Sequence, residues 1–205
     1  MNSVYISCPS IDGKIESTSV TSLFNLGKKL FQNGINSDID IVSGISIISV
    51  ARDISAYRFM KTDFSHIVMI DSDIGINPDD IIECINSGYD FCAIPYRKRT
   101  DGLPAFSYST QYENEYASSI FRPGNYAGTG AMVLSRKVFE SMDAPSYPWY
   151  DIELKEYFKS GLNSNNVFIG EDVNFCDKWT SSGEKIWIKS DGKTSHVSKI
   201  LVEQS

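Results

Sequence analysis

Three features that mark large classes of protein are scarce in this sequence: long apolar segments, closely spaced cysteines and an excess of positive charge. No stretch approaches the 18 consecutive apolar residues of a membrane-spanning helix, and no charged segment followed by a long apolar one opens the chain. We therefore expect a soluble, cytoplasmic protein with no membrane segment, which would reach a membrane only through a partner.

The cysteines and the charges exclude further classes. The four cysteines lie in separate apolar segments without a CxxC pair, at Cys8, Cys84, Cys92 and Cys176. This spacing favours buried free thiols over a disulfide framework or a zinc site. The 19 Lys and Arg against 26 Asp and Glu give a net charge of −7, which argues against a surface built to bind a polyanion. One local basic cluster stands apart, at Arg97, Lys98 and Arg99.

The length and the apolar pattern predict the fold class. With 205 residues, 41% of them hydrophobic, one domain with one sizeable core is the default. Strands are expected at "VYISCPS", "DIDIV", "HIVMI", "DFCAIP", "GTGAMVLS" and "KIWIKS". Helices are expected from Val20 to Phe31, from Ile45 to Met60, and within "NPDDIIECINSG", "RKVFESM" and "GEDVNFCDKWTSSG". Strands alternating with helices predict an α/β fold whose mostly parallel sheet is covered on both faces.

Two segments depart from this regular pattern. Residues 96–126 are rich in Ser, Tyr, Gly and Pro, which indicates a functional or disordered segment, with room for an antiparallel pair around "AFSYSTQYENEYASSIF". The segment "SYPWYDIELKEYFKSG" is expected to form an aromatic loop followed by a helix.

Two aspartates, Asp71 and Asp73, directly follow the apolar run "HIVMI". Side chains at positions i and i+2 of an extended segment point to the same side. The carboxyl end of a strand in a parallel α/β sheet is where ligand crevices form. Either the two acids cap the loop before the helix that begins at Asn77, or they bind a hard cation, Mn²⁺ or Mg²⁺, together with substrate phosphates.

Three further motifs admit both a structural and a functional interpretation. Glu171 and Asp172 either cap a helix or provide a general base. Gly128 and Gly130, around Thr129, form either a tight turn or a close backbone approach to a ligand. His196 lies in a polar stretch, where a lone histidine is commonly a surface side chain.

The order of these motifs resembles that of the GT-A class of nucleotide-sugar glycosyltransferases, particularly its small bacterial and viral members. The resemblance covers nearly all of the chain, through "CPSIDG", "SGISIISVARDISAYRFM", "HIVMIDSDIGINPDDI", "GTGAMVLSRKVFESM", "YPWYDIELKEYF", "GEDVNFCDKW" and "KIWIKSDGKTSH". It implies one GT-A domain over residues 1–205, with a nucleotide-binding half of about 1–95 and an acceptor and catalytic half of about 96–205. It also implies a hexosyl- or pentosyltransferase that moves a sugar from a nucleotide-diphosphate donor, with a UDP-sugar favoured, to an acceptor hydroxyl with inversion.

The resemblance further implies roles for individual residues. Asp71, Asp73 and His196 would hold Mn²⁺ or Mg²⁺ in a DxD-type site. Asp172 would be the catalytic base, and Glu171 a positioning or acceptor-binding acid. Donor binding would involve Pro9, Ser10, Asp12, Arg52, Asp53, Asp71, Ser72, Asp73, Gly128, Thr129 and Gly130. Asp53 departs from the family, which has Asn at this position.

Some roles rest on residue type alone. Arg97 and Lys98 could add donors to the donor phosphates, although a solvated basic loop explains them equally well. The rings of Tyr147, Trp149 and Tyr150 could stack on an acceptor sugar or a base, although core packing explains them as well. The acceptor is not readable, and a glycan, a protein, a small molecule and a hydroxylated nucleic-acid base all stay open.

Three rival functions fit parts of the pattern. A haloacid-dehalogenase-type phosphatase also has a DxD motif, but on its first strand and continued by Gly-Thr or Gly-Val rather than "IGINP". A nucleotidyltransferase needs a glycine-rich basic loop after its first strand, which "CPSIDGK" matches poorly. A non-catalytic sugar-nucleotide-binding domain would have no need of a base.

Overall fold

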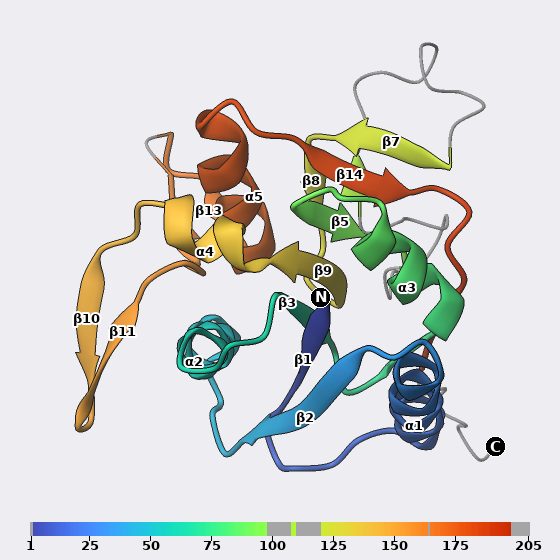
Figure 1. Cartoon of the computed structure of the whole chain (residues 1–205). Coiled ribbons are helices and arrows are strands. Elements are labelled where there is room, and N and C mark those ends of the chain that lie inside the picture. Colours follow the sequence, from blue (N-terminus) through green and yellow to red (C-terminus); the bar gives the residue numbers. More distant parts are fainter. Residues whose placement is uncertain (1, 98–107, 110–119, 164, 198–205) are drawn as a thin grey trace, which may run out of the picture.

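A seven-stranded sheet forms the centre of the molecule (Figure 1). The computed structural model describes residues 2–97, 108–109, 120–163 and 165–197. In spatial order, the strands are β2 (Asn36–Ser43), β1 (Ser3–Ser10), β3 (His66–Ile70), β9 (Ala131–Ser135), β5 (Phe91–Ala93), β14 (Ile186–Lys189) and β7 (Phe121–Gly124). Strands β2, β1, β3, β5 and β14 share one direction, whereas β9 and β7 run antiparallel to their neighbours. The predicted mostly parallel α/β sheet is confirmed.

Helices cover both faces of this sheet, as Figure 1 shows. Helices α1 (Ser17–Gln32) and α3 (Pro78–Asn86) lie on one side, and α2 (Ile48–Met60), α4 (Arg136–Ser141) and α5 (Glu171–Ser181) on the other. Successive residues of β3 alternate between two buried clusters, with Ile67 and Met69 in one and Val68 and Ile70 in the other. A strand buried on both faces reads as a continuous apolar run, which is why "HIVMI" was recognisable as a strand.

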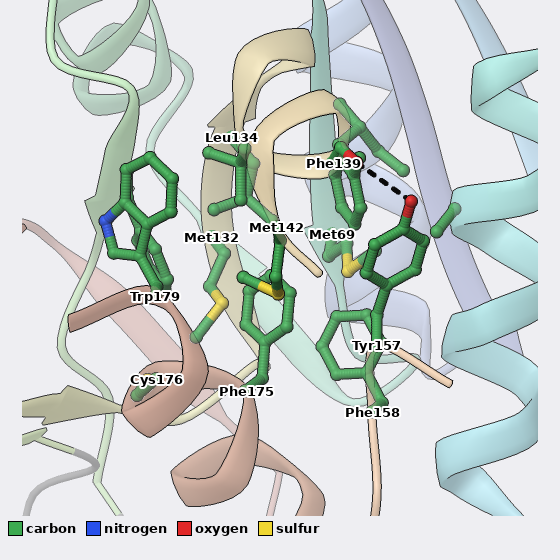
Figure 2. Packing of buried hydrophobic residues seen from close by; sticks show 14 of the residues in the cluster. Met69, Met132, Leu134, Phe139, Met142, Tyr157, Phe158, Phe175, Cys176 and Trp179 are labelled. Carbon is green, nitrogen blue, oxygen red and sulfur yellow. Dashed lines mark hydrogen bonds between the residues drawn. The ribbon is translucent and has the colours of Figure 1, made fainter. Parts of the chain in front are cut away.

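Aromatic side chains fill the cluster on the α4 and α5 side (Figure 2). Phe175 of α5 stacks on Phe158, with ring centroids 4.2 Å apart and an interplanar angle of 17°. The Tyr157 hydroxyl donates a hydrogen bond of 2.9 Å to the backbone oxygen of Phe139, so the one polar atom of that ring is satisfied inside the core.

One predicted helix is wrong. The segment "SYPWYDIELKEYFKSG" forms an antiparallel hairpin of β10 (Ser146–Trp149) and β11 (Ile152–Lys155), which extends from the left of Figure 1. Its turn contains Tyr150 at φ 52°, and Leu154 is buried between exposed neighbours. The alternation of buried and exposed residues has the period of a strand, and the aromatic residues favour strands.

Three two-stranded ribbons complete the described chain. They pair β4 (Ile74–Ile76) with β15 (Thr194–His196), β6 (Tyr108–Ser109) with β8 (Tyr126–Ala127), and β12 (Gly161–Leu162) with β13 (Phe168–Ile169). Most of "AFSYSTQYENEYASSIF", where an antiparallel pair was expected, lies outside the described residues.

The predicted state of the cysteines is confirmed. All four are buried and free. Burial raises the pKa of Cys8 and of Cys176 to about 12, so both thiols are protonated at neutral pH and are not nucleophiles. Within the residues that the structure describes, none of the helices is long and apolar enough to cross a membrane.

Phe175→Ala should destabilise the protein by about 3–5 kcal/mol, because Phe175 is fully buried and its removal leaves a cavity against Phe158. Denaturant unfolding measures this loss. Phe168→Ala is the matched control, since the Phe168 side chain is 69% exposed and its loss should cost less than about 0.5 kcal/mol. Equal losses in the two variants would contradict the packing described for Phe175.

Candidate functional site

A cavity of about 330 Å³ opens at the carboxyl ends of β1 and β3. The end of β1, the turn Asp71-Ser72-Asp73 (the DxD turn), the segment that leads into α2 with its first turns, and the start of α5 line it. The lining residues are Pro9, Ser10, Ile11, Ile45, Ser46, Ile48, Ala51, Arg52, Asp71, Ser72, Asp73 and Glu171. The position agrees with the rule that ligands bind at the carboxyl edge of such sheets.

A buried cation, Arg52, lies at the wall of this cavity with 3% of its side chain exposed. Its Nη2 donates to Asp71 Oδ1 at 2.8 Å, and its Nε lies 3.5 Å from Glu171 Oε1. Two of its nitrogen atoms, Nε and Nη1, are buried without a hydrogen-bond partner among the described residues. Buried N–H groups normally have partners, so this guanidinium is suited to a ligand that brings acceptor oxygens.

The glycine motif packs against Asp71. Pairing of β3 with β9 places Gly130 beside Asp71, whose N–H donates to the Gly130 oxygen at 3.0 Å. A Cβ atom at Gly130 would lie 2.8 Å from Tyr96 Cζ and 2.9 Å from Asp71 Oδ2. Gly128 and Thr129, which directly precede Gly130, are buried as well. The small residue therefore leaves room for the carboxylate and the Tyr96 ring.

Asp73 and His196 come together from distant parts of the sequence. Pairing of β4 with β15 places His196 opposite Ile74, with its Nε2 3.6 Å from Asp73 Oδ1. His196 Nδ1 lies 2.6 Å from the backbone oxygen of Arg97, so Nδ1 carries the proton and donates it. In the neutral imidazole, the lone pair of Nε2 then faces the carboxylate.

This arrangement fits a divalent cation. A lone pair and a carboxylate repel each other at this distance unless a cation or a proton lies between them. Metal-binding histidines commonly donate their other N–H to a backbone carbonyl, as His196 does. Carboxylate oxygens suit Mn²⁺ and Mg²⁺ alike, and imidazole is a common ligand of divalent transition metals. Of the three predicted ligands, Asp73 and His196 are adjacent and Asp71 is hydrogen-bonded to Arg52. No group of three metal-ligating side chains has formed in the described part of the chain.

The two acids at the start of α5 have different surroundings. Glu171 lines the cavity and lies beside Arg52. Asp172 is outside the cavity lining; its Oδ1 accepts a 2.8 Å bond from the Val173 N–H. Its Oδ2 has no hydrogen-bond partner among the described residues, so this oxygen can accept a proton.

Asp53, which the sequence placed with the donor, faces away from the cavity. Its carboxylate is 2% exposed and accepts bonds from the Tyr147 hydroxyl at 2.9 Å and the Phe158 N–H at 3.0 Å. Burial raises its pKa to about 7, although these hydrogen bonds act in the opposite direction. Asp53 therefore connects α2 to the segment that contains the β10–β11 hairpin.

The other predicted residues are scattered. Asp12 is outside the cavity lining and forms a 2.8 Å ion pair with Lys14. Arg97 lines a second cavity of about 440 Å³ together with His196, and Lys98 lies outside the described residues. Tyr150 is 90% exposed. Trp149 belongs to the same hydrophobic cluster as Ile45 and Ala51, two residues that line the first cavity.

One residue that lies between the predicted site residues, Tyr96, was not among those predicted from the sequence. Its hydroxyl accepts a 3.3 Å bond from the Gly130 N–H, and its ring meets that of His196 edge-on at 5.6 Å. It thus connects the glycine motif to the predicted metal ligand. Its place directly after the strand "DFCAIP" was the available signal, since side chains that follow neighbouring strands gather at one edge of the sheet.

Comparisons with known proteins bear on the fold. No protein-family model matches the chain, and no curated protein matches its sequence. Among solved structures, A197 from STIV is 20% identical with a TM-score of 0.61, covering 97% of this chain and 87% of that one. A mutant of Drosophila β1,4-galactosyltransferase 7, in complex with manganese, UDP-Gal and xylobiose, is 12% identical with a TM-score of 0.56, covering 97% and 72%. GalNAc-T7 with UDP, GalNAc and Mn²⁺ is 12% identical with a TM-score of 0.52, covering 98% and 44%.

These likenesses, at identities of 20% and below, establish the fold alone. The chain has the GT-A fold of nucleotide-sugar glycosyltransferases, as the resemblance in the sequence implied. The activity is a separate question, because one fold hosts many functions.

Gly130→Ala should displace Asp71 or the Tyr96 ring, because the added methyl group would lie within 3 Å of both, and it should weaken at least tenfold the nucleotide and metal binding that the resemblance implies. Calorimetric titration of Mn²⁺ and of UDP measures the loss. Gly27→Ala is the control: its Cβ would meet nothing within 4 Å, and alanine in a helix should raise stability by about 0.5–1 kcal/mol without changing binding. Unchanged binding by Gly130→Ala would show that the glycine is not needed for the carboxylate.

Asp53→Asn should remove a pH dependence of stability. The folded protein holds the Asp53 proton more tightly than the unfolded chain, so the free energy of unfolding should fall by a few kcal/mol as the pH rises from about 4 to about 7. Urea unfolding across this range measures the slope. It should flatten in Asp53→Asn and persist in Asp63→Asn, a change at an exposed acid after the same helix. The same slope in wild type and Asp53→Asn would rule out Asp53 as its source.

Proposed function

We propose that this protein is a metal-dependent glycosyltransferase, in which a single domain transfers a sugar from a nucleotide-diphosphate donor to an acceptor hydroxyl. The observation that carries the proposal is Arg52, a buried guanidinium whose Nε and Nη1 have no hydrogen-bond partner among the described residues, in a cavity that it shares with the DxD turn. A buried cation beside two carboxylates suits a site that receives a second anion together with a divalent metal.

The donor would bind in this cavity. Pro9, Ser10 and Ile45 offer a partly apolar wall for a nucleobase, and Arg52 offers donors to the diphosphate. Asp71, Asp73 and His196 would hold Mn²⁺ or Mg²⁺, which neutralises the charge that develops on the leaving diphosphate. Arg97 and Lys98 would add donors to the same phosphates. A UDP-sugar is favoured, in keeping with the UDP and UDP-Gal bound in two of the structural neighbours.

The acceptor would be activated at the start of α5. Asp172 would take the proton of the acceptor hydroxyl through its uncommitted Oδ2, as a general base. Glu171 stays beside Arg52 and would position the reacting groups. Attack on the anomeric carbon from the face opposite the diphosphate inverts that centre. Trp149 and Tyr150 would provide a ring surface for the acceptor near the cavity.

Titration of UDP, GDP and CDP into the purified protein, with Mn²⁺ and then with EDTA, tests the donor class. We expect UDP to bind with Mn²⁺ and at least tenfold more weakly with EDTA. If none of the three nucleotides bound, the donor site would be refuted.

Two variants should separate binding from catalysis in the same assay. Asp73→Asn should abolish metal-dependent binding of UDP, whereas Asp172→Asn should retain binding and lose transfer, or donor hydrolysis, by a factor of at least 100. Asp63→Asn changes an exposed acid outside the cavity lining and is the control. Wild-type turnover by Asp172→Asn would exclude this residue as the base.

A further inference from the structure

The position of His196 depends on a short ribbon. Strand β15 pairs antiparallel with β4, with His196 opposite Ile74, and the Val197 N–H donates to the Asp73 oxygen at 3.1 Å. The approach is close, because a Cβ atom at Gly75 would collide with the Ser195 side chain. Three paired residues are a small contact, so the segment that leads into β15 needs anchoring of its own.

That anchor lies at Lys193, the residue before β15. Its N–H donates a 2.7 Å bond to Asp80 Oδ2, and its backbone oxygen accepts a 3.1 Å bond from the Asn77 N–H. Asp80 lies in the first turn of α3, the helix that follows the DxD turn and β4, and it is 6% exposed. One buried carboxylate thus connects the segment of Asp73 to the segment of His196.

A buried lysine compensates the charge of Asp80. Lys189, at the end of β14, is 1% exposed, and its Nζ lies 3.6 Å from Asp80 Oδ1, 2.8 Å from Glu83 and 2.6 Å from Asp191. A buried carboxylate without such a partner would be strongly destabilising. With it, Asp80 Oδ1 faces the ammonium group and Oδ2 accepts from the Lys193 N–H.

We propose that Asp80 is a positioning residue that holds His196 against Asp73 and thereby sets the affinity of the metal site. This inference rests on the proposed function in one respect, the metal bound by Asp73 and His196. Asp80 touches neither metal nor substrate and acts only through the backbone of Lys193.

Glu83 provides a matched control on the same helix. It also pairs with Lys189, but it is 52% exposed and makes no hydrogen bond to the ribbon. Both Asp80→Ala and Glu83→Ala remove one negative charge from the surroundings of Lys189. Only Asp80→Ala also removes the hydrogen bond to the Lys193 N–H. Asp80→Asn adds a second comparison, because the amide oxygen can still accept from the Lys193 N–H without the charge.

The affinity for Mn²⁺ can be measured without turnover, from the electron paramagnetic resonance signal of the free ion. Asp80→Ala should raise the Kd for Mn²⁺ about tenfold, within the range known for residues that orient metal ligands. Glu83→Ala and Asp80→Asn should stay within about threefold of wild type. In the His196→Ala background, Asp80→Ala should cause no further loss, because its effect passes through His196. Asp80→Ser, whose hydroxyl does not reach Lys193, replaces Asp80→Ala if that variant does not fold.

The outcomes separate this inference from the proposed function. If wild type binds Mn²⁺, His196→Ala weakens binding and Asp80→Ala does not, the positioning role is overturned and the metal site stands. Equal losses in Asp80→Asn and Asp80→Ala would assign the effect to charge and overturn the role of the hydrogen bond. A wild-type protein without Mn²⁺ affinity would refute the metal site itself, and the inference with it.

Discussion

The buried charge of Arg52 is the constraint on which the site depends. A guanidinium with 3% of its side chain exposed is stable only where carboxylates surround it, and here they come from the end of β3 and the start of α5. This requirement fixes α2, β3 and α5 relative to one another at one point. It also holds Asp71 and Glu171 close together without mutual repulsion. The protein therefore holds Arg52, Asp71 and Glu171 together as one charged cluster at the wall of the cavity.

Around this point, the fold uses the carboxyl edge of the sheet for chemistry and the two faces for stability. The aromatic cluster behind α4 and α5 and the aliphatic cluster behind α1 and α3 share five strands, and β1, β3, β9, β5 and β14 each contribute alternate residues to both. The polar groups at the edge are then supported by a rigid, close-packed interior. Asp53 shows how close the two roles lie: it follows Arg52 directly, yet it points to the opposite side and bonds to Tyr147 and Phe158.

The sequence predicted the main elements because their signals are local. The apolar run before Asp71 and the Asn77–Pro78 helix start are readable without any knowledge of neighbours. The β10–β11 hairpin was misread as a helix because, in a short segment, a few turn residues decide between the helical and the strand period of the apolar residues. In the site, the adjacency of Asp73 and His196 was implied by resemblance alone, since pairing of β4 with β15 is a contact between residues more than 100 positions apart. The turn of Asp53 away from the cavity and the role of Tyr96 depend on tertiary packing, which no local pattern encodes.

The position of β9 has a consequence for how the chain folds during synthesis. β9 lies between β3 and β5, so the group β2-β1-β3 and the group β5-β14-β7 are joined only through it. It consists of residues 131–135 and runs against both neighbours. A nascent chain that has emerged only to residue 95 thus exposes an edge of β3, with apolar side chains on both faces. Such edges promote aggregation, and distant pairings form slowly. β9 must emerge from the ribosome before it can pair with β3, so this edge of β3 stays open while the residues between β3 and β9 are synthesised.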